Sequence, residues 1–206
     1  QKGLGATAKF KPTDWFYFQA GASDAKSVST MVGLNNSFRG AFLIGEFGIS
    51  PKIRGFRGNY RFIIDSDREK LERIDGLGEK NGDYGYALSF DQQISKHLTL
   101  FCRYGFADKK VRSIQHFWSC GGQFSEPIPG RKNDIFGIGM AQSISGEDYR
   151  QVNAKASAET MYEIYYNFSA HPFVKITPNI QIVTHPNTQK DSSCDVVIGT
   201  RLVVVF

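Results

Sequence analysis

Arginine and carboxylate side chains stand at alternate positions within segments that are otherwise aromatic and aliphatic. Arg61 follows Asn59 by two residues, Tyr165 follows Glu163 by two, and Arg201 lies near the C-terminus. Arginine offers five donors in a rigid fork, a carboxylate accepts from a pair of hydroxyls, and an aromatic face can pack along an apolar surface. Side chains of these types on one surface could bind a hydroxylated solute weakly and release it again.

The histidines raise the alternative of catalysis or metal binding. No serine lies in a nucleophile-elbow pattern, and His97, His171 and His185 fall in or beside expected loops. His116 and Cys120 would share one face of a strand but lie about 13 Å apart, at about 3.3 Å per residue, too far to hold one ion. We therefore expect no catalytic residue and no metal site.

Composition limits the fold class. The 206 residues contain no linker-like segment, so we expect a single domain over residues 1–206. No stretch of 18 uncharged apolar residues occurs, which excludes a transmembrane helix. Composition does not exclude a transmembrane β-barrel, because its strands alternate lipid-facing and lumen-facing residues and therefore have a moderate mean hydropathy. The mean hydropathy of this chain is −0.32.

Charge, cysteines and the first residues add three further points. The net charge of +5 is spread thinly and forms no basic cluster interleaved with aromatics, so we expect no nucleic-acid partner. Cys102, Cys120 and Cys194 lack metal-ligand spacing, and their odd number leaves at least one thiol unpaired. The first residues do not resemble a signal peptide, so either a signal has been removed or the start of the protein is missing.

Period-two alternation of apolar and polar residues recurs along the chain, interrupted by connections that contain Gly, Pro, Asn and Asp. It is clear in residues 159–169, where one face is apolar and the other polar. A helical turn is predicted at only one segment, residues 67–74. The alternation predicts an all-β protein with strands at residues 3–11, 14–22, 40–50, 57–65, 82–92, 97–107, 113–124, 133–143, 159–169, 173–184 and 195–206.

Strand and connection lengths favour a membrane barrel over a soluble β-sandwich. Segments of 9 to 12 residues suit a tilted crossing of a bilayer, whereas soluble strands have about five or six residues. Short connections such as residues 51–56, 94–96 and 170–172 alternate with long ones at 23–39, 66–81, 144–158 and 185–195. This asymmetry predicts a transmembrane antiparallel up-and-down β-barrel, with short turns at one end and long loops at the other.

The predicted number of strands, about eleven, is odd, whereas bacterial single-chain barrels normally have an even number. An open sheet would also leave two edges in lipid, where nothing satisfies their backbone groups. We therefore expect further strands before Gln1, and a chain that forms the later part of a larger barrel.

The C-terminal segment, residues 159–206, resembles the OprB family of carbohydrate-selective porins. The family pattern is a strand rich in Glu and Tyr, a Pro-Asn/Asp-hydrophobic-Gln strand, an Asn-Pro loop, and a final strand with Gly-x-Arg that ends in Phe. The matching residues are Glu163, Tyr165, Tyr166, Pro178, Asn179, Gln181, His185, Pro186, Asn187, Gly199, Arg201 and Phe206.

Two upstream segments extend the resemblance. LSFDQQISKHLTLFCRYGFAD resembles a family hairpin, and GRKNDIFGIGMA resembles a family Gly-Arg…Asp…Gly element. The matching residues are Asp91, Gln92, Phe101, Arg103, Tyr104, Gly105, Gly130, Arg131, Asp134, Gly137 and Gly139. The sequence departs from the pattern in THPNTQ and in its three cysteines.

The resemblance implies a water-filled barrel of about sixteen strands in the bacterial outer membrane. Small sugars and other small hydrophilic solutes would pass by diffusion, without a cofactor. Outer-membrane lipid and lipopolysaccharide would surround the barrel. Phe206 would belong to the signal that the barrel-assembly machinery reads. Assembly into a homo-oligomer is a further possibility.

The phase of each strand places a set of polar residues on the inner wall. The strongest candidates for solute contact are Arg61, Arg103, Glu163 and Arg201, followed by Glu46, Asp91, Asn59, Tyr165 and Gln181, with Lys9, Gln19 and Asn167 on the same face. The competing interpretation is that inward Arg and Glu pair across strands only to satisfy one another. A loop folded inward, residues 23–39 or 66–81, could narrow the pore.

Three other functions stay open on the sequence alone: an outer-membrane enzyme, a soluble β-sandwich that binds carbohydrate, and a purely structural barrel. A barrel should need detergent and should migrate faster on a gel unboiled than boiled. A plugged barrel should admit no solute into liposomes.

Overall fold

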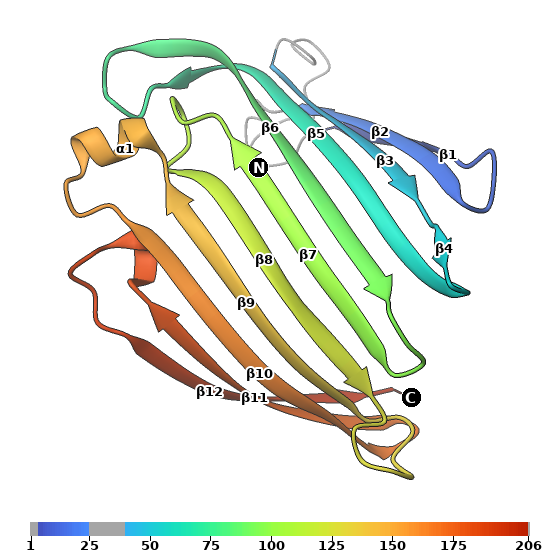
Figure 1. Cartoon of the computed structure of the whole chain (residues 1–206). Helices are drawn as coiled ribbons and strands as arrows, with labels where there is room; N and C mark the ends of the chain where they lie inside the picture. Colours follow the sequence, from blue (N-terminus) through green and yellow to red (C-terminus); the bar gives the residue numbers. More distant parts are fainter. Residues whose placement is uncertain (1–3, 25–39, 206) are drawn as a thin grey trace.

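The structure is a computed structural model, and it describes residues 4–24 and 40–205. Its main feature is one antiparallel sheet in which each strand of the main path pairs with the strands before and after it in that path (Figure 1). Within the described residues the strands are β1 Gly5–Phe10, β2 Phe16–Asp24, β3 Ala41–Ile49, β4 Lys52–Ile53, β5 Phe56–Glu72, β6 Glu79–Gln93, β7 Leu98–Ala107, β8 Ile114–Ser125, β9 Ile135–Ser145, β10 Ala158–His171, β11 Val174–Thr184 and β12 Asp195–Val204.

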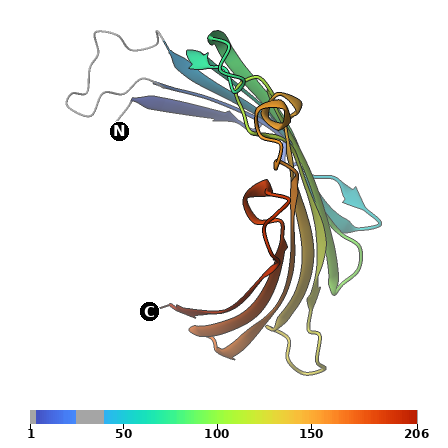
Figure 2. The ribbon, with the colours of Figure 1, turned by 90° about the vertical axis from the view of Figure 1, so that its left-hand side faces the viewer.

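The sheet curves into an open arc, with β1 and β12 at its two edges (Figure 2). Because all neighbours are antiparallel, the connections gather at two ends. One end, which we call the short end, carries residues 11–15, 50–55, 94–97, 126–134 and 172–173. The other, the long end, carries residues 73–78, 108–113, 146–157 and 185–194, with the helix α1 Glu147–Val152 and the short helix η2 Pro186–Thr188.

Within residues 4–24 and 40–205, no second layer covers either face of the sheet (Figure 2). In the described part of the chain, the only hydrophobic residues that are buried are Ala41 and Ala156. The accessible surface is 13615 Å², whereas a compact folded protein of 23.1 kDa exposes about 9,700 Å². A β-sandwich would bury its apolar face against a second sheet, so the alternative of a soluble β-sandwich is wrong.

The eleven long strands are confirmed, with ends that differ from the predicted ones by a few residues except at β5. The helical turn predicted at residues 67–74 is wrong, because β5 continues to Glu72 and pairs with β6 beyond a bulge between Asp67 and Lys70. The long loop predicted at 66–81 is accordingly reduced to residues 73–78. The neighbouring strand supplies hydrogen bonds that the local sequence does not reveal.

Three small elements, β4, α1 and η2, were not predicted. Strand β4 forms a tight hairpin with β5, in which Arg54 and Gly55 both have positive φ, as a two-residue turn of this kind requires. Helix α1 lies within the connection predicted at 144–158 and has Glu147 and Asp148 in its first turn. No helix in the described residues is long and apolar enough to cross a membrane.

Candidate functional site

The strand register places the predicted wall residues on one face of the sheet, which we call the polar face. Gln19 stands opposite both Lys9 on β1 and Glu46 on β3, and Asn59 on β5 stands opposite Asp91 on β6. Further along, Glu163 pairs with Gln181 and Thr177 pairs with Arg201. The opposite face is apolar and exposed, with Phe62, Ile64, Phe90, Ile138, Ile180 and Leu202 among its side chains.

Three charged residues form a cluster on β5, β6 and β7. Arg61 and Arg103 both stand opposite Ser89, whose short side chain leaves room for the two guanidinium groups. Each then reaches Asp91: Arg61 Nη2 donates to Oδ2 and Arg103 Nη2 donates to Oδ1, both at 3.3 Å. One carboxylate thus holds two arginines, and the cluster keeps one excess positive charge.

At the β1–β3 side of the polar face, Tyr17 joins two charges. Its hydroxyl donates to Glu46 Oε1, and the Lys9 ammonium lies 4.1 Å from the centre of its ring. Asn59, on the neighbouring β5, accepts a hydrogen bond from Ser50 Oγ at 3.1 Å. Charges at this side of the sheet are therefore held by neighbours, as the competing interpretation of the sequence expects.

The β10–β12 side is arranged differently. Asn179 Nδ2 and Gln181 Nε2 both donate to the same oxygen of Glu163, Oε1, at 2.9 and 3.1 Å. Arg201 lies on the edge strand β12, is exposed, and has no ion pair or hydrogen bond from its side chain within the described residues. A hollow of about 560 Å³ is lined by Glu163, Tyr165, Asn179 and Arg201, with Gln123, Ile135, Asn167, Thr177, Gly199 and Thr200 as its other walls.

Aromatic rings laid over glycines are a feature that sequence reasoning missed. Tyr165 is the cross-strand partner of Gly137, and a Cβ on that glycine would lie only 2.3 Å from the ring. Phe101 covers Gly121 on β8 in the same way. Glycine removes the side chain that would otherwise stand beneath the ring, so the ring lies flat on the sheet. Only the register between two strands reveals such a pair.

The Gly-Arg…Asp element acts as an anchor at the short end. Asp134 is 1% exposed and accepts from Arg131 Nε at 2.5 Å, from the Tyr166 hydroxyl at 2.7 Å and from the Ser169 backbone N–H at 2.9 Å. The hydrogen bond from the Arg131 guanidinium is the main cause that holds the pKa of Asp134 at about 2, well below its ordinary value. The connection before β9 is thereby fixed to the end of β10.

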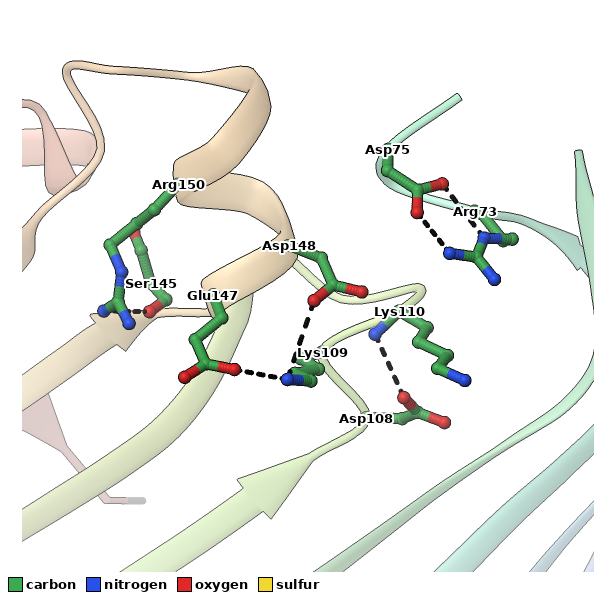
Figure 3. A network of polar contacts seen from close by, with 9 residues as sticks. All are labelled: Arg73, Asp75, Asp108, Lys109, Lys110, Ser145, Glu147, Asp148 and Arg150. Atoms are coloured by element: carbon green, nitrogen blue, oxygen red, sulfur yellow. Dashed lines mark hydrogen bonds and ion pairs between the residues drawn. The ribbon is translucent and has the colours of Figure 1, made fainter. Parts of the chain in front are cut away.

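The connections at the long end are joined by ion pairs (Figure 3). Lys109 binds Glu147 and also lies 3.7 Å from Asp148, both in α1. The hydrogen bond to Glu147 raises the pKa of Lys109, and the same contact lowers the pKa of Glu147. The Arg73 guanidinium hydrogen-bonds Asp75 and, as the largest cause, holds the pKa of that carboxyl at about 2.

Backbone bonds complete this joined end. The N–H of Ile74 donates to the Lys110 carbonyl at 2.8 Å, and the N–H of Ser157 donates to the Thr188 carbonyl at 2.6 Å. The tip of the β5–β6 hairpin, the β7–β8 connection and α1 therefore form one connected rim, beside which η2 is tied to the connection that follows α1.

Some predictions cannot be compared with this geometry. Phe206 and residues 25–39 lie outside the described residues, so the assembly signal and the first of the two candidate constricting loops stay predictions. Cys102 and Cys120 are cross-strand neighbours on the apolar face and, like Cys194, are free thiols. Within the described chain, no three His, Cys, Asp or Glu residues are grouped so that they could hold a metal ion.

Comparisons with known proteins agree with the arrangement of the strands. The sequence matches the family model described as carbohydrate-selective porin, OprB family, over residues 2–206. It is 27% identical over 202 residues to Porin AaxA of Chlamydia felis, which covers 96% of this chain and 44% of that protein. It is 22% identical to Porin B of Pseudomonas aeruginosa, with 100% of this chain and 55% of that protein covered.

Solved structures show the same fold. The high-pH structure of Pseudomonas putida OprB superposes with a TM-score of 0.86 at 20% identity, over 97% of this chain and 58% of that one. The outer-membrane channel DcaP of Acinetobacter baumannii gives a TM-score of 0.61 at 13% identity, over 96% of this chain and 60% of that one. The chain spans about half the length of the curated relatives that it matches.

Proposed function

The chain belongs to the OprB family of carbohydrate-selective porins, and we propose on this premise that it forms part of the wall of a water-filled channel. The channel lies in the bacterial outer membrane and lets small sugars and other small hydrophilic solutes diffuse through. No energy input, cofactor or catalytic step is involved.

The separation of the two faces of a single sheet is the observation that carries this proposal. In the described structure, all strands except β4 belong to one antiparallel path, and no second layer covers either face. All strands except β1 and β4 have 9 to 17 residues. Strands of this length can cross a bilayer at a tilt. The exposed apolar face then contacts lipid, and the polar face is left for water.

The wall residues have the chemistry that weak solute binding requires. Arg61, Arg103 and Arg201 offer donors, whereas Glu46, Asp91 and Glu163 accept from hydroxyls. The amides of Asn59 and Gln181 and the ring of Tyr165 complete the set of candidate contacts. Because most of these groups are already partly hydrogen-bonded to one another, each contact with a passing solute is weak, and the solute is released readily.

The edges of the sheet support a larger barrel. In the described structure β1 and β12 each pair on one side only, and lipid cannot satisfy the backbone groups of the free side. We propose that further strands of the same even-stranded barrel close the wall, so that residues 1–206 form part of a single barrel domain. Outer-membrane lipopolysaccharide and the barrel-assembly machinery, with Phe206 in the recognition signal, are proposed partners, and the barrel could form a homo-oligomer.

Solute uptake by liposomes that contain the refolded protein tests this function. We expect osmotic swelling in glucose and in smaller hydrophilic solutes, with a rate that falls as the solute grows, because diffusion through water has no other requirement. Liposomes made without protein give the baseline. A protein that is inserted in the bilayer, as judged by its faster migration when unboiled, but admits no solute would contradict the proposal and favour a structural barrel.

A further inference from the structure

Three rings on the polar face lie flat over glycines of the next strand. Tyr17 covers Gly48, and the ring atoms lie as close as 2.1 Å to the place where a Cβ would stand. Phe101 covers Gly121, where the closest ring atom is at 2.7 Å. Tyr165 covers Gly137 at 2.3 Å. One face of each ring thus packs on the sheet, and the other is presented away from it.

The second face is occupied in two of the three rings. The Lys9 ammonium lies 4.1 Å from the centre of the Tyr17 ring, and the Arg103 guanidinium lies 4.7 Å from the centre of the Phe101 ring. Aromatic faces attract cations because their π-electrons make the face negative. Among the described residues no cation covers Tyr165, whose second face is open.

The open face of Tyr165 borders the hollow of about 560 Å³ between β8 and β12. Gln123 Nε2 donates to the Tyr165 hydroxyl at 2.5 Å, which fixes the far end of the ring. Ring orientation is therefore set from below by Gly137 and at its tip by Gln123. A ring held in this way loses little freedom when a ligand stacks on it.

Polar groups stand around the same hollow. Asn179 and Gln181 both donate to Glu163 Oε1, so in the described structure Oε2 has no hydrogen-bond partner. The Arg201 guanidinium also lines the hollow and carries several donors. The hollow thus combines a flat apolar face, a free acceptor and guanidinium donors.

We propose that Tyr165 is a stacking platform for a pyranose ring, with Glu163 and Arg201 as the hydroxyl partners at its edge. A pyranose has an apolar face of C–H groups and a rim of hydroxyls, which fits a flat ring flanked by an acceptor and a donor. A hollow of this volume lies in the range of small-molecule sites. This inference rests on the proposed function and adds the position and the solute class of one subsite.

Block of ion current by solutes in planar bilayers tests the platform. Glucose presents a pyranose ring, whereas sorbitol has similar size and hydroxyls but no ring face. We expect wild-type protein to be blocked at lower concentrations of glucose than of sorbitol. Tyr165→Ala should reduce this preference by roughly two- to tenfold, the range for loss of one aromatic contact. Tyr165→Phe should keep it, because the ring remains.

Two further variants separate stacking from pore width. Gly137→Ala keeps the ring but places a methyl group beneath it, and should also weaken the glucose preference. Tyr17→Ala removes a ring whose open face is already covered by Lys9, and should leave the preference unchanged. A wider pore alone would change the block by glucose and by sorbitol equally.

The outcomes distinguish this inference from the function on which it rests. An unchanged glucose preference in Tyr165→Ala, or a wild-type channel that glucose and sorbitol block equally, would overturn the platform while ion current still supports a channel. Absence of any ion current in inserted wild-type protein would instead overturn the proposed porin function.

Discussion

Two regions of the polar face use the same residue types in different ways. On β5–β7, Asp91 binds both Arg61 and Arg103, so that three charges satisfy one another. On β10–β12, the carboxylate of Glu163 binds two neutral amides through one oxygen, and its other oxygen has no hydrogen-bond partner in the described structure.

The difference separates two tasks that charged residues perform in a channel wall. A charge that is paired across strands stabilises the sheet and contributes to the electric field of the lumen, but offers few free donors. A carboxylate that is held only by neutral amides contributes to the same field and keeps one oxygen for a solute. On the proposed channel function, we propose that the β5–β7 region mainly sets electrostatic selectivity and that the β10–β12 region mainly contacts solutes.

The largest expected effect is on stability and concerns how each region is held at the short end. Asp134 fixes the β9–β10 end through a buried network, whereas the 94–97 turn relies on Ser95 Oγ, which accepts from the backbone of His97 and Leu98. Asp134→Asn leaves Arg131 without its charge partner. We expect the unboiled, fast-migrating gel band to be lost at a clearly lower temperature than in wild type, and Ser95→Ala to cause a smaller change.

The same carboxylate predicts a pH dependence. Its pKa is about 2 in the folded protein and about 3.9 when unfolded, so ionised Asp134 stabilises the fold above pH 4. This contribution is lost as the pH falls from about 4 to 2. The difference in stability between wild type and Asp134→Asn should shrink over that interval, and a difference that persists at pH 2 would contradict the assigned role.

A third prediction concerns the charge at the centre of the β5–β7 cluster. Asp91→Asn leaves two arginines without compensation, so the channel should favour anions more strongly. A unit charge about 5 Å from a passing ion changes its energy by about 0.8 kcal/mol in water, which corresponds to about fourfold in relative permeability. The reversal potential in a KCl gradient measures this change. No shift, or a shift toward cations, would place Asp91 outside the conducting path.

The smallest expected effect compares one charged residue from each region. Arg103→Gln breaks a partly exposed ion pair and should lower the free energy of unfolding by up to about 1 kcal/mol. Glu163→Gln breaks no ion pair in the described structure, because two neutral amides hold its carboxylate, and should change stability by much less. Urea titration in lipid vesicles, followed by the shift of the unboiled band, compares the two variants directly. Equal losses would remove the distinction between the two regions.

The strands could be predicted from sequence because alternation is a local property. Tyr162 and Ile164 face one side and Glu163 and Tyr165 the other whatever their neighbours are. The helical turn predicted at residues 67–74 failed for the opposite reason. Its charged residues fit a helix locally, but pairing of β5 with β6 supplies the hydrogen bonds that extend the strand to Glu72.

The face of each wall residue could be predicted in the same way, but its partners could not. Arg61 and Arg103 meet at Asp91 only because both stand opposite Ser89. That register cannot be deduced from the sequence of a single strand. The flat packing of the Tyr165 ring on Gly137 likewise depends on the register between β9 and β10. Sequence therefore identified the candidate groups, whereas the division into a paired and an unpaired region required the structure.

The central claim, that the polar face lines water and the apolar face contacts lipid, can be tested at two adjacent residues of β12. In a variant with Cys102, Cys120 and Cys194 replaced by serine, Arg201→Cys and Leu202→Cys are each exposed to a charged, membrane-impermeant thiol reagent in proteoliposomes. We predict rapid labelling of Arg201→Cys, with a change in ion current, and protection of Leu202→Cys by lipid. Rapid labelling of Leu202→Cys together with protection of Arg201→Cys would contradict the account.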